Sequence, residues 1–130
     1  MSDWTAADLE RIGDATELDL ASRRDDGTLS PFVTMWVVRV GDDLYVRSVN
    51  GPSASWFRDT RARDEARVSA GGVERDVRLV DVADMDDALD AAYRAKYRRY
   101  AANIIDHITS PKARSATLRL VPPTDDRGGA

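Results

Sequence analysis

The segment 46–59 holds the side chains with the clearest chemical pattern, five small polar residues between a strand pattern and a helix pattern. These residues are Ser48, Asn50, Gly51, Ser53 and Ser55, and Arg47 and Arg58 bracket them. Backbone N–H groups at a helix start carry partial positive charge, glycine lets a ligand approach closely, and serine hydroxyls donate hydrogen bonds. The segment therefore suits an anion such as a phosphate. The same residue types also make ordinary turns and N-caps, so this second interpretation stands beside the first.

A second group of reactive side chains lies later in the chain. Tyr93, Tyr97 and Tyr100 recur at helical spacing, and Lys96 lies among them. If these residues lined a substrate pocket, Lys96 or Tyr97 would donate a proton. The alternative is an amphipathic helix that packs its aromatic side on the core, and the periodicity favours this alternative.

The remaining polar residues give weaker signals. The carboxylates Asp84, Asp86, Asp87 and Asp90 lack the spacing of an EF-hand and suit the first turn of a helix, so we expect no metal site. With no Cys and a single histidine, His107, the chain has no disulfide, no zinc-thiolate site and no thiol chemistry. The basic run 94–100 fits a solvated helix face better than an RNA contact.

Composition places the chain among ordinary globular proteins. Its 130 residues fit one domain, expected over 1–121, and the polar segment 122–130 is expected to be a disordered tail. The net charge of −4 argues against a nucleic-acid partner. No apolar segment is long enough to span a membrane and no signal peptide is visible, so we expect a cytoplasmic protein without a membrane partner. A small-molecule ligand is the expected partner, and the chain is expected to be a monomer or a homodimer.

Local patterns predict the elements that would position these residues. A helix begins after the N-cap Thr5 and includes Leu9 and Ile12. Strands are expected at 17–24, 31–40, 44–48, 66–70, 73–82 and 115–121, with turns at 25–27 and at Gly71-Gly72, and further helices are expected at 53–62 and 84–103. The run 31–40 is apolar on both faces and is expected to be central, and Trp36 and Trp56 are expected to be largely buried. Short antiparallel strands around one core predict an α+β fold, a split antiparallel β-barrel of about six strands with peripheral helices.

The segment 23–82 resembles the FMN-binding split β-barrel superfamily, which includes the pyridoxamine phosphate oxidases and the deazaflavin-dependent nitroreductases. The resemblance rests on the order of a basic strand end, a D-G turn, a long apolar strand, a G-D-D turn, "LYVRS", a polar loop, a tryptophan helix and a hairpin. The run "SASWFRDTRARDEARVSAGG" is most similar to the nitroreductase branch. Within the superfamily, the chain resembles a small uncharacterised bacterial family marked by "YRAKY".

This resemblance implies a cofactor site at the end of "LYVRS". The residues that match the phosphate-holding strand end and loop are Ser48, Asn50, Gly51, Ser53 and Ser55. Thr34 and Trp36 would lie beside the flavin ring, Arg24 and Arg47 would supply charge, and Trp56 is a further cofactor-binding residue. The implied cofactor is a deazaflavin coenzyme or FMN, and the implied activity is hydride transfer to a small molecule of unknown identity. The alternative is a non-catalytic split-barrel module that binds a small anionic ligand or a protein partner.

Overall fold

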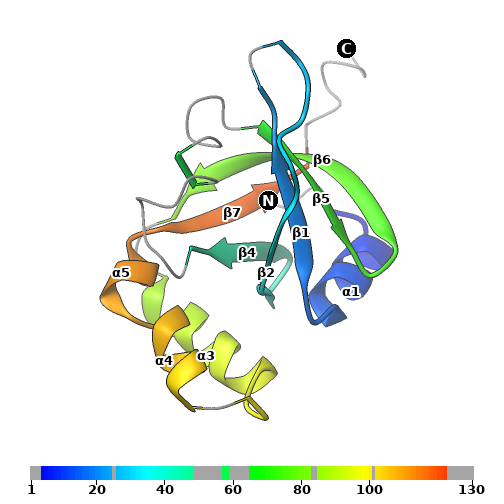
Figure 1. Cartoon of the computed structure of the whole chain (residues 1–130). Helices are drawn as coiled ribbons and strands as arrows, with labels where there is room; N and C mark the ends of the chain where they lie inside the picture. Colours follow the sequence, from blue (N-terminus) through cyan, green and yellow to red (C-terminus); the bar gives the residue numbers. More distant parts are fainter. Residues whose placement is uncertain are drawn as a thin grey trace.

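Antiparallel strands form a single sheet that curls into a nearly closed barrel (Figure 1). The computed structural model describes residues 4–24, 26–48, 57–58, 65–82, 85–100 and 102–122, with only the backbone of Ala102. Within these residues the strands are β1 (Leu18–Ser22), β2 (Val33–Met35), β3 (Val37–Val40), β4 (Asp43–Arg47), β5 (Glu65–Ala70), β6 (Val73–Asp81) and β7 (Thr117–Val121). Their order in the sheet is β2-β1-β5-β6-β7-β4-β3. The predicted split-barrel fold is therefore confirmed, with seven described strands rather than about six.

The apolar run 31–40 is two short strands and not the single central strand that its sequence predicts. β2 pairs with β1, whereas β3 pairs with β4, so the two strands lie at opposite ends of the sheet order. Trp36 separates them, and the chain passes there from one end of the sheet to the other. One straight strand cannot pair with both neighbours, and the break brings the two ends of the sheet together. Because β2 is at the end of the sheet order, its first residue Val33 and the preceding Phe32 are 36% and 45% exposed.

Helix α1 (Ala6–Asp14) forms as its sequence predicts. The Thr5 hydroxyl accepts a hydrogen bond from the backbone N–H of Asp8 at 3.1 Å, and Leu9 and Ile12 are buried. In Figure 1 this helix lies at the lower right of the barrel, away from the other labelled helices. None of the helices in the described ranges is long and apolar enough to cross a membrane.

The predicted helix 84–103 is interrupted. The described helices here are α3 (Asp86–Lys96), α4 (Ala102–Ile108) and α5 (Pro111–Arg114). Helix α3 ends at Lys96, and its C-cap residue Tyr97 has a side chain that is buried against β3 and hydrogen-bonded there. The break turns α4 back along α3 and brings Ile108 into the same core cluster as Tyr93. The sequence prediction also missed α5, which Ser110 caps and Pro111 begins.

Two hydrophobic clusters cover the two faces of the sheet. Leu44 and Val46 of β4 belong to the cluster that fills the barrel, with apolar residues from α1 and the other strands. Tyr45 lies between them in sequence and belongs to the second cluster, under α3 and α4. Alternation along β4 therefore sends Arg47 to the helix-covered face and directs Ser48 toward the barrel.

Substitutions in the β5–β6 turn test how closely α1 packs against this turn. Gly71 and Gly72 both have positive φ, +59° and +82°. A Cβ at Gly71 would lie 2.3 Å from the Arg11 carbonyl oxygen at the end of α1, whereas a Cβ at Gly72 would meet nothing within 4 Å. We expect Gly72→Ala to cost about 1–2 kcal/mol of unfolding free energy, from its left-handed backbone alone. Gly71→Ala should exceed that cost by at least about 1 kcal/mol, because backbone must also shift. Urea unfolding of both variants measures the difference. Equal losses of unfolding free energy would show that α1 does not pack closely against the turn.

Candidate functional site

Ser48 follows directly after β4 and is 1% exposed. Its backbone N–H donates to the Ala116 carbonyl oxygen at 3.0 Å, which fixes its position beside the start of β7. Its hydroxyl has no hydrogen-bond partner within the described part of the chain. A buried hydroxyl without a partner is unfavourable for folding alone, and it is free to bind a ligand. The predicted strand-end donor is therefore present and unused.

Half of the predicted cofactor-binding residues lie outside the described residues. They are Asn50, Gly51, Ser53, Ser55 and Trp56. The same holds for most of the predicted helix 53–62 and for the predicted tail from 123 onward. The loop as an anion cradle, the burial of Trp56 and the disorder of the tail therefore stay predictions.

Arg47, which the resemblance places beside the cofactor, is buried between the barrel and the helices. Its Nε donates to Thr117 Oγ1 at 3.0 Å, and one terminal nitrogen donates to Asp90 Oδ1 at 2.5 Å and to the Ile108 carbonyl oxygen at 3.1 Å. The guanidinium also lies 5.5 Å from the centre of the Tyr93 ring. The carboxylate of Asp90 neutralises the positive charge of Arg47 in the core. These contacts give Arg47 a role in holding the helices on the barrel.

Asp90 links Arg47 to a second arginine. Its side chain is 2% exposed, and its other carboxylate oxygen accepts hydrogen bonds from Arg114, including one from Nε at 2.9 Å. The resulting Arg47–Asp90–Arg114 network ties α3 and α5 to β4. Sequence reasoning considered Asp90 only as a metal ligand or a first-turn carboxylate, because its partners are 43 and 24 residues away.

Two other predicted cofactor residues lie on or near the β1–β2 hairpin. Thr34 is exposed and donates to Asp19 Oδ1 at 2.6 Å across the paired strands. Arg24 is exposed beside the turn, where its backbone N–H donates to the Thr28 carbonyl oxygen. Neither forms a hydrogen bond with Ser48. The described residues thus do not gather Arg24, Thr34 and Ser48 into one hydrogen-bonded group.

Trp36 lies at the break between β2 and β3, and its predicted burial is confirmed only in part. Its ring stacks flat on Tyr97, with centroids 3.8 Å apart and an interplanar angle of 2°. Tyr100 meets the ring edge-on at 5.0 Å. Because Trp36 lies outside the regular strands, it is half-buried rather than enclosed. Together the three rings form an aromatic wall on the helix-covered side of the barrel.

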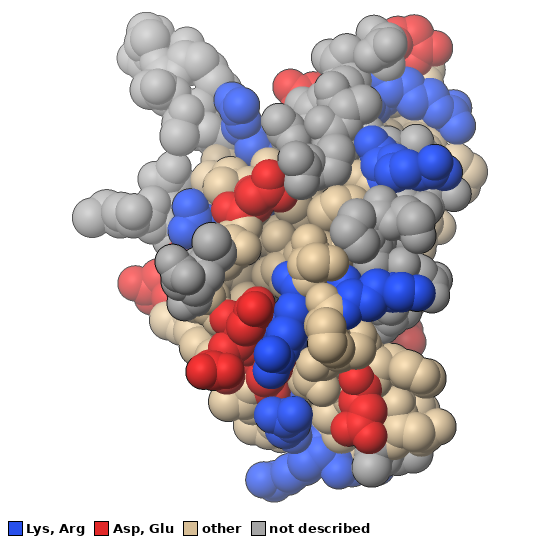
Figure 2. Space-filling model, turned by 90° about the vertical axis from the view of Figure 1, so that its left-hand side faces the viewer, with Lys and Arg blue, Asp and Glu red and all other residues tan. Residues whose placement is uncertain are grey.

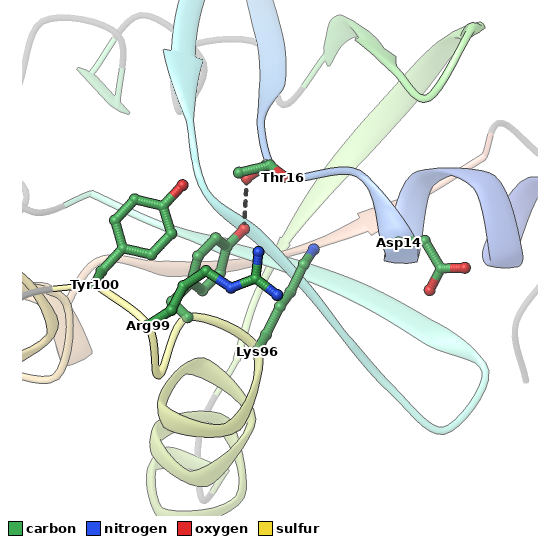
Figure 3. A pocket seen from close by; sticks show the side chains of 6 residues that line it. Asp14, Thr16, Lys96, Arg99 and Tyr100 are labelled. Atoms are coloured by element: carbon green, nitrogen blue, oxygen red, sulfur yellow. Dashed lines mark hydrogen bonds between the residues drawn. The ribbon is translucent and has the colours of Figure 1, made fainter.

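A pocket of about 190 Å³ adjoins this aromatic wall. Its lining residues are Asp14, Thr16, Lys96, Tyr97, Arg99 and Tyr100. They come from the end of α1, the segment before β1 and the end of α3, which meet below the barrel (Figure 3). The sequence pointed to the tyrosines and to Lys96, but no local pattern signals Asp14, Thr16 or Arg99, because the fold brings them together from some 80 residues apart.

Tyr97 and Lys96 meet at the first residue of β3. The Tyr97 hydroxyl lies 2.7 Å from the Thr16 carbonyl oxygen and accepts from the backbone N–H of Val37 at 3.2 Å. Lys96 Nζ donates to the Val37 carbonyl oxygen at 2.6 Å and lies 5.3 Å from the centre of the Tyr97 ring. Burial raises the pKa of Tyr97, so its hydroxyl holds its proton firmly. Burial lowers the pKa of Lys96 to about 8, against the opposing charge of Asp14. Of the two predicted proton donors, Lys96 has the pKa better matched to neutral pH.

The core-packing alternative is therefore right for part of the tyrosine series. Tyr93 and Tyr97 are buried, at 0% and 1% exposed, whereas Tyr100 is 38% exposed and lines the pocket. The three arginines of this segment, Arg94, Arg98 and Arg99, are exposed, whereas Lys96 is half-buried. On the side of the molecule where α4 and α5 lie, basic and acidic side chains are interspersed (Figure 2).

The barrel and its helices define a class of protein, the split β-barrels. Solved structures of this fold include an F420 reductase, 18% identical to this chain, with a TM-score of 0.56 over 89% of this chain and 92% of that one. A FAD-binding protein from Mesorhizobium loti is 18% identical, with a TM-score of 0.58 over 93% and 91% of the two chains. A heme storage protein from Vibrio cholerae is 13% identical, with a TM-score of 0.62 over 92% and 90%. At these identities the likeness establishes the split-barrel fold alone.

The sequence also establishes the family to which the chain belongs. Residues 8–120 match the family described as "Uncharacterized protein conserved in bacteria (DUF2255)". The chain belongs to this bacterial family. No curated protein matches it.

Proposed function

We propose that the protein binds a flavin-type cofactor beside Ser48 and transfers hydride to a small molecule. The observation that carries the proposal is the buried Ser48 hydroxyl, which has no partner within the described residues and lies at the strand end where the resemblance implies a phosphate. The likeness in fold to an F420 reductase and to a FAD-binding protein supports it.

The described residues fit such a cofactor in part. Ser48 offers a donor to a phosphate oxygen, and the half-buried Trp36, whose ring stacks on the buried Tyr97, offers a flat apolar surface just before β3. Arg47 is paired with Asp90, so positive charge for the phosphate has to come from other residues, with the exposed Arg24 and Arg58 as candidates. When bound, the cofactor would supply the hydride, and the protein would hold it, orient it and exclude water. Lys96 would hold a proton near the same strand.

A deazaflavin is expected to bind better than FMN. Its long acidic tail needs several cations, and arginines suit phosphate and carboxylate groups. Fluorescence titration of the purified protein with F420 and with FMN at low salt tests this order, and added salt should weaken the binding. Tighter binding of FMN would reverse the order. Binding of neither would overturn the proposal.

Ser48→Ala separates a ligand-binding role from a structural one. We expect the variant to keep or slightly raise the melting temperature, because it removes a buried hydroxyl without a partner. Cofactor affinity should fall about tenfold or more, since a hydrogen bond to a charged group is lost. Ser69→Ala on β5 is the matched control and should leave affinity unchanged. Unchanged affinity in Ser48→Ala would remove Ser48 from the site.

The second candidate is a non-catalytic split-barrel module that binds a small anionic ligand or a protein partner. The pocket with Lys96 and Arg99 favours it, because two cations line a space too small for a flavin. A protein that is colourless and gains no thermal protection from F420 or FMN would support this candidate over hydride transfer.

A further inference from the structure

We propose that the pocket between α1 and α3 binds a small monocarboxylate that carries a planar ring. Arg99 and Lys96 would hold the carboxylate, and Tyr100 would contact the ring. The argument rests on the pocket's own residues and does not depend on whether a flavin binds beside Ser48.

Lys96 and Arg99 both have N–H donors left for a ligand. Lys96 has three N–H donors and uses one of them on the Val37 carbonyl oxygen. Arg99 is exposed, and no described residue forms an ion pair with it. Both side chains line the same pocket, and Figure 3 shows them at the end of α3 between Tyr100 and Asp14. A carboxylate between them would accept charge-assisted hydrogen bonds from both.

The charge of the pocket selects a monoanion. Lys96 and Arg99 are positive and Asp14 is negative, so two cations and one carboxylate leave one net positive charge. Figure 3 places Asp14 on the far side of the pocket from Tyr100, at the end of α1. A second carboxylate on the ligand would meet Asp14 unfavourably.

The size and walls of the pocket select a small flat molecule. A volume of about 190 Å³ is below the roughly 300–1,000 Å³ of pockets for drug-sized ligands. The exposed ring of Tyr100 stands at one side, and the buried Tyr97 ring forms another part of the lining. Aromatic surfaces of this kind favour a ring over a flexible chain.

Titration with benzoate, followed by the backbone amide NMR signals of residues 16 and 96–100, tests the proposal. We expect saturable shifts with a Kd on the order of 1 mM, reasonable for a ligand of this size. Benzamide, which has the same shape but no charge, should bind at least about tenfold more weakly. Equal affinity for benzamide, or no saturation by about 10 mM benzoate, would overturn the proposal.

A matched pair of arginine variants locates the site. Arg99→Gln should weaken benzoate binding about tenfold, whereas Arg98→Gln should change it less than about twofold. Both side chains are exposed and adjacent in sequence, but only Arg99 lines the pocket. Neither substitution should alter the melting temperature. Equal weakening by both variants would mean that benzoate responds only to general surface charge, and the assignment would fail.

Discussion

Asp90→Asn is expected to destabilise the protein by about 3–5 kcal/mol, because it leaves a buried arginine without a counter-charge. The Arg47 side chain is fully buried, and Asp90 is its closest carboxylate, at 2.5 Å. Asp86 also approaches Arg47, at 3.5 Å, but is half-exposed and cannot replace a buried partner. Urea unfolding measures the loss, and Asp87→Asn, an exposed residue of the same helix, is the control and should cost less than about 0.5 kcal/mol.

The cost should come from the unpaired charge and not from lost volume. The double variant Arg47→Met/Asp90→Leu removes both charges, so it should recover much of the stability that Asp90→Asn loses. A double variant as unstable as the sum of its single variants would contradict this explanation, and so would an Asp90→Asn variant within about 1 kcal/mol of the original protein.

The same network predicts a response to acid. Burial raises the pKa of Asp90, but the hydrogen bonds from Arg114 and Arg47 outweigh burial and lower the pKa below its ordinary value of 3.8. A carboxyl with a lowered folded-state pKa stabilises the protein fully above its unfolded pKa and loses that contribution as the pH falls further. Below about pH 4 the protein should therefore lose stability, and Asp90→Asn should lose less of it over that range.

Tyr97→Ala is expected to cost about 3–5 kcal/mol, a loss similar to that of Asp90→Asn. Its ring is 1% exposed and stacks on Trp36, and its hydroxyl joins Val37 at the start of β3 to Thr16 before β1. Tyr97→Phe keeps the ring and should cost only about 1–3 kcal/mol, for the backbone N–H of Val37 left without an acceptor.

The partly exposed Tyr100 is the natural control for Tyr97. Tyr100→Ala should cost less than about 1 kcal/mol, because 38% of its surface is already exposed. Thermal and urea unfolding should rank the variants as Tyr97→Ala, Tyr97→Phe and Tyr100→Ala, from the largest loss to the smallest. A Tyr97→Ala variant no less stable than Tyr100→Ala would show that the aromatic wall does not hold α3 on the barrel.

The elements that local chemistry determines were predictable from the sequence. Thr5 caps α1 and Gly71-Gly72 makes the β5–β6 turn, because capping and positive φ depend on a few adjacent residues. The run 31–40 was predicted to be one central strand because both of its faces are largely apolar, and this prediction was wrong. Its break at Trp36 was not predictable, because the break depends on β1 and β4, which pair with its two halves.

In the candidate site, too, features that depend on adjacent residues were predictable and features that depend on distant contacts were not. Ser48 was found because it ends a strand before a polar loop, which is a local signal. Arg47 was assigned to the cofactor because sequence does not reveal Asp90 as its buried partner. Asp14 and Thr16 reach the pocket only through the packing of α1 and α3 around the start of β3. Charge pairing and pocket lining depend on distant contacts, and periodicity carries no information about them.

The place of β7 in the sheet has a consequence for how the chain is made. β7 lies between β6 and β4 (Figure 1), so it joins the four-strand part β2-β1-β5-β6 to the pair β4-β3. A ribosome synthesises every strand that β7 pairs with before it reaches Thr117. Until then, the facing edges of β4 and β6 are open and offer unpaired N–H and C=O groups to other nascent chains. Closure of the barrel among the described strands therefore has to wait for β7.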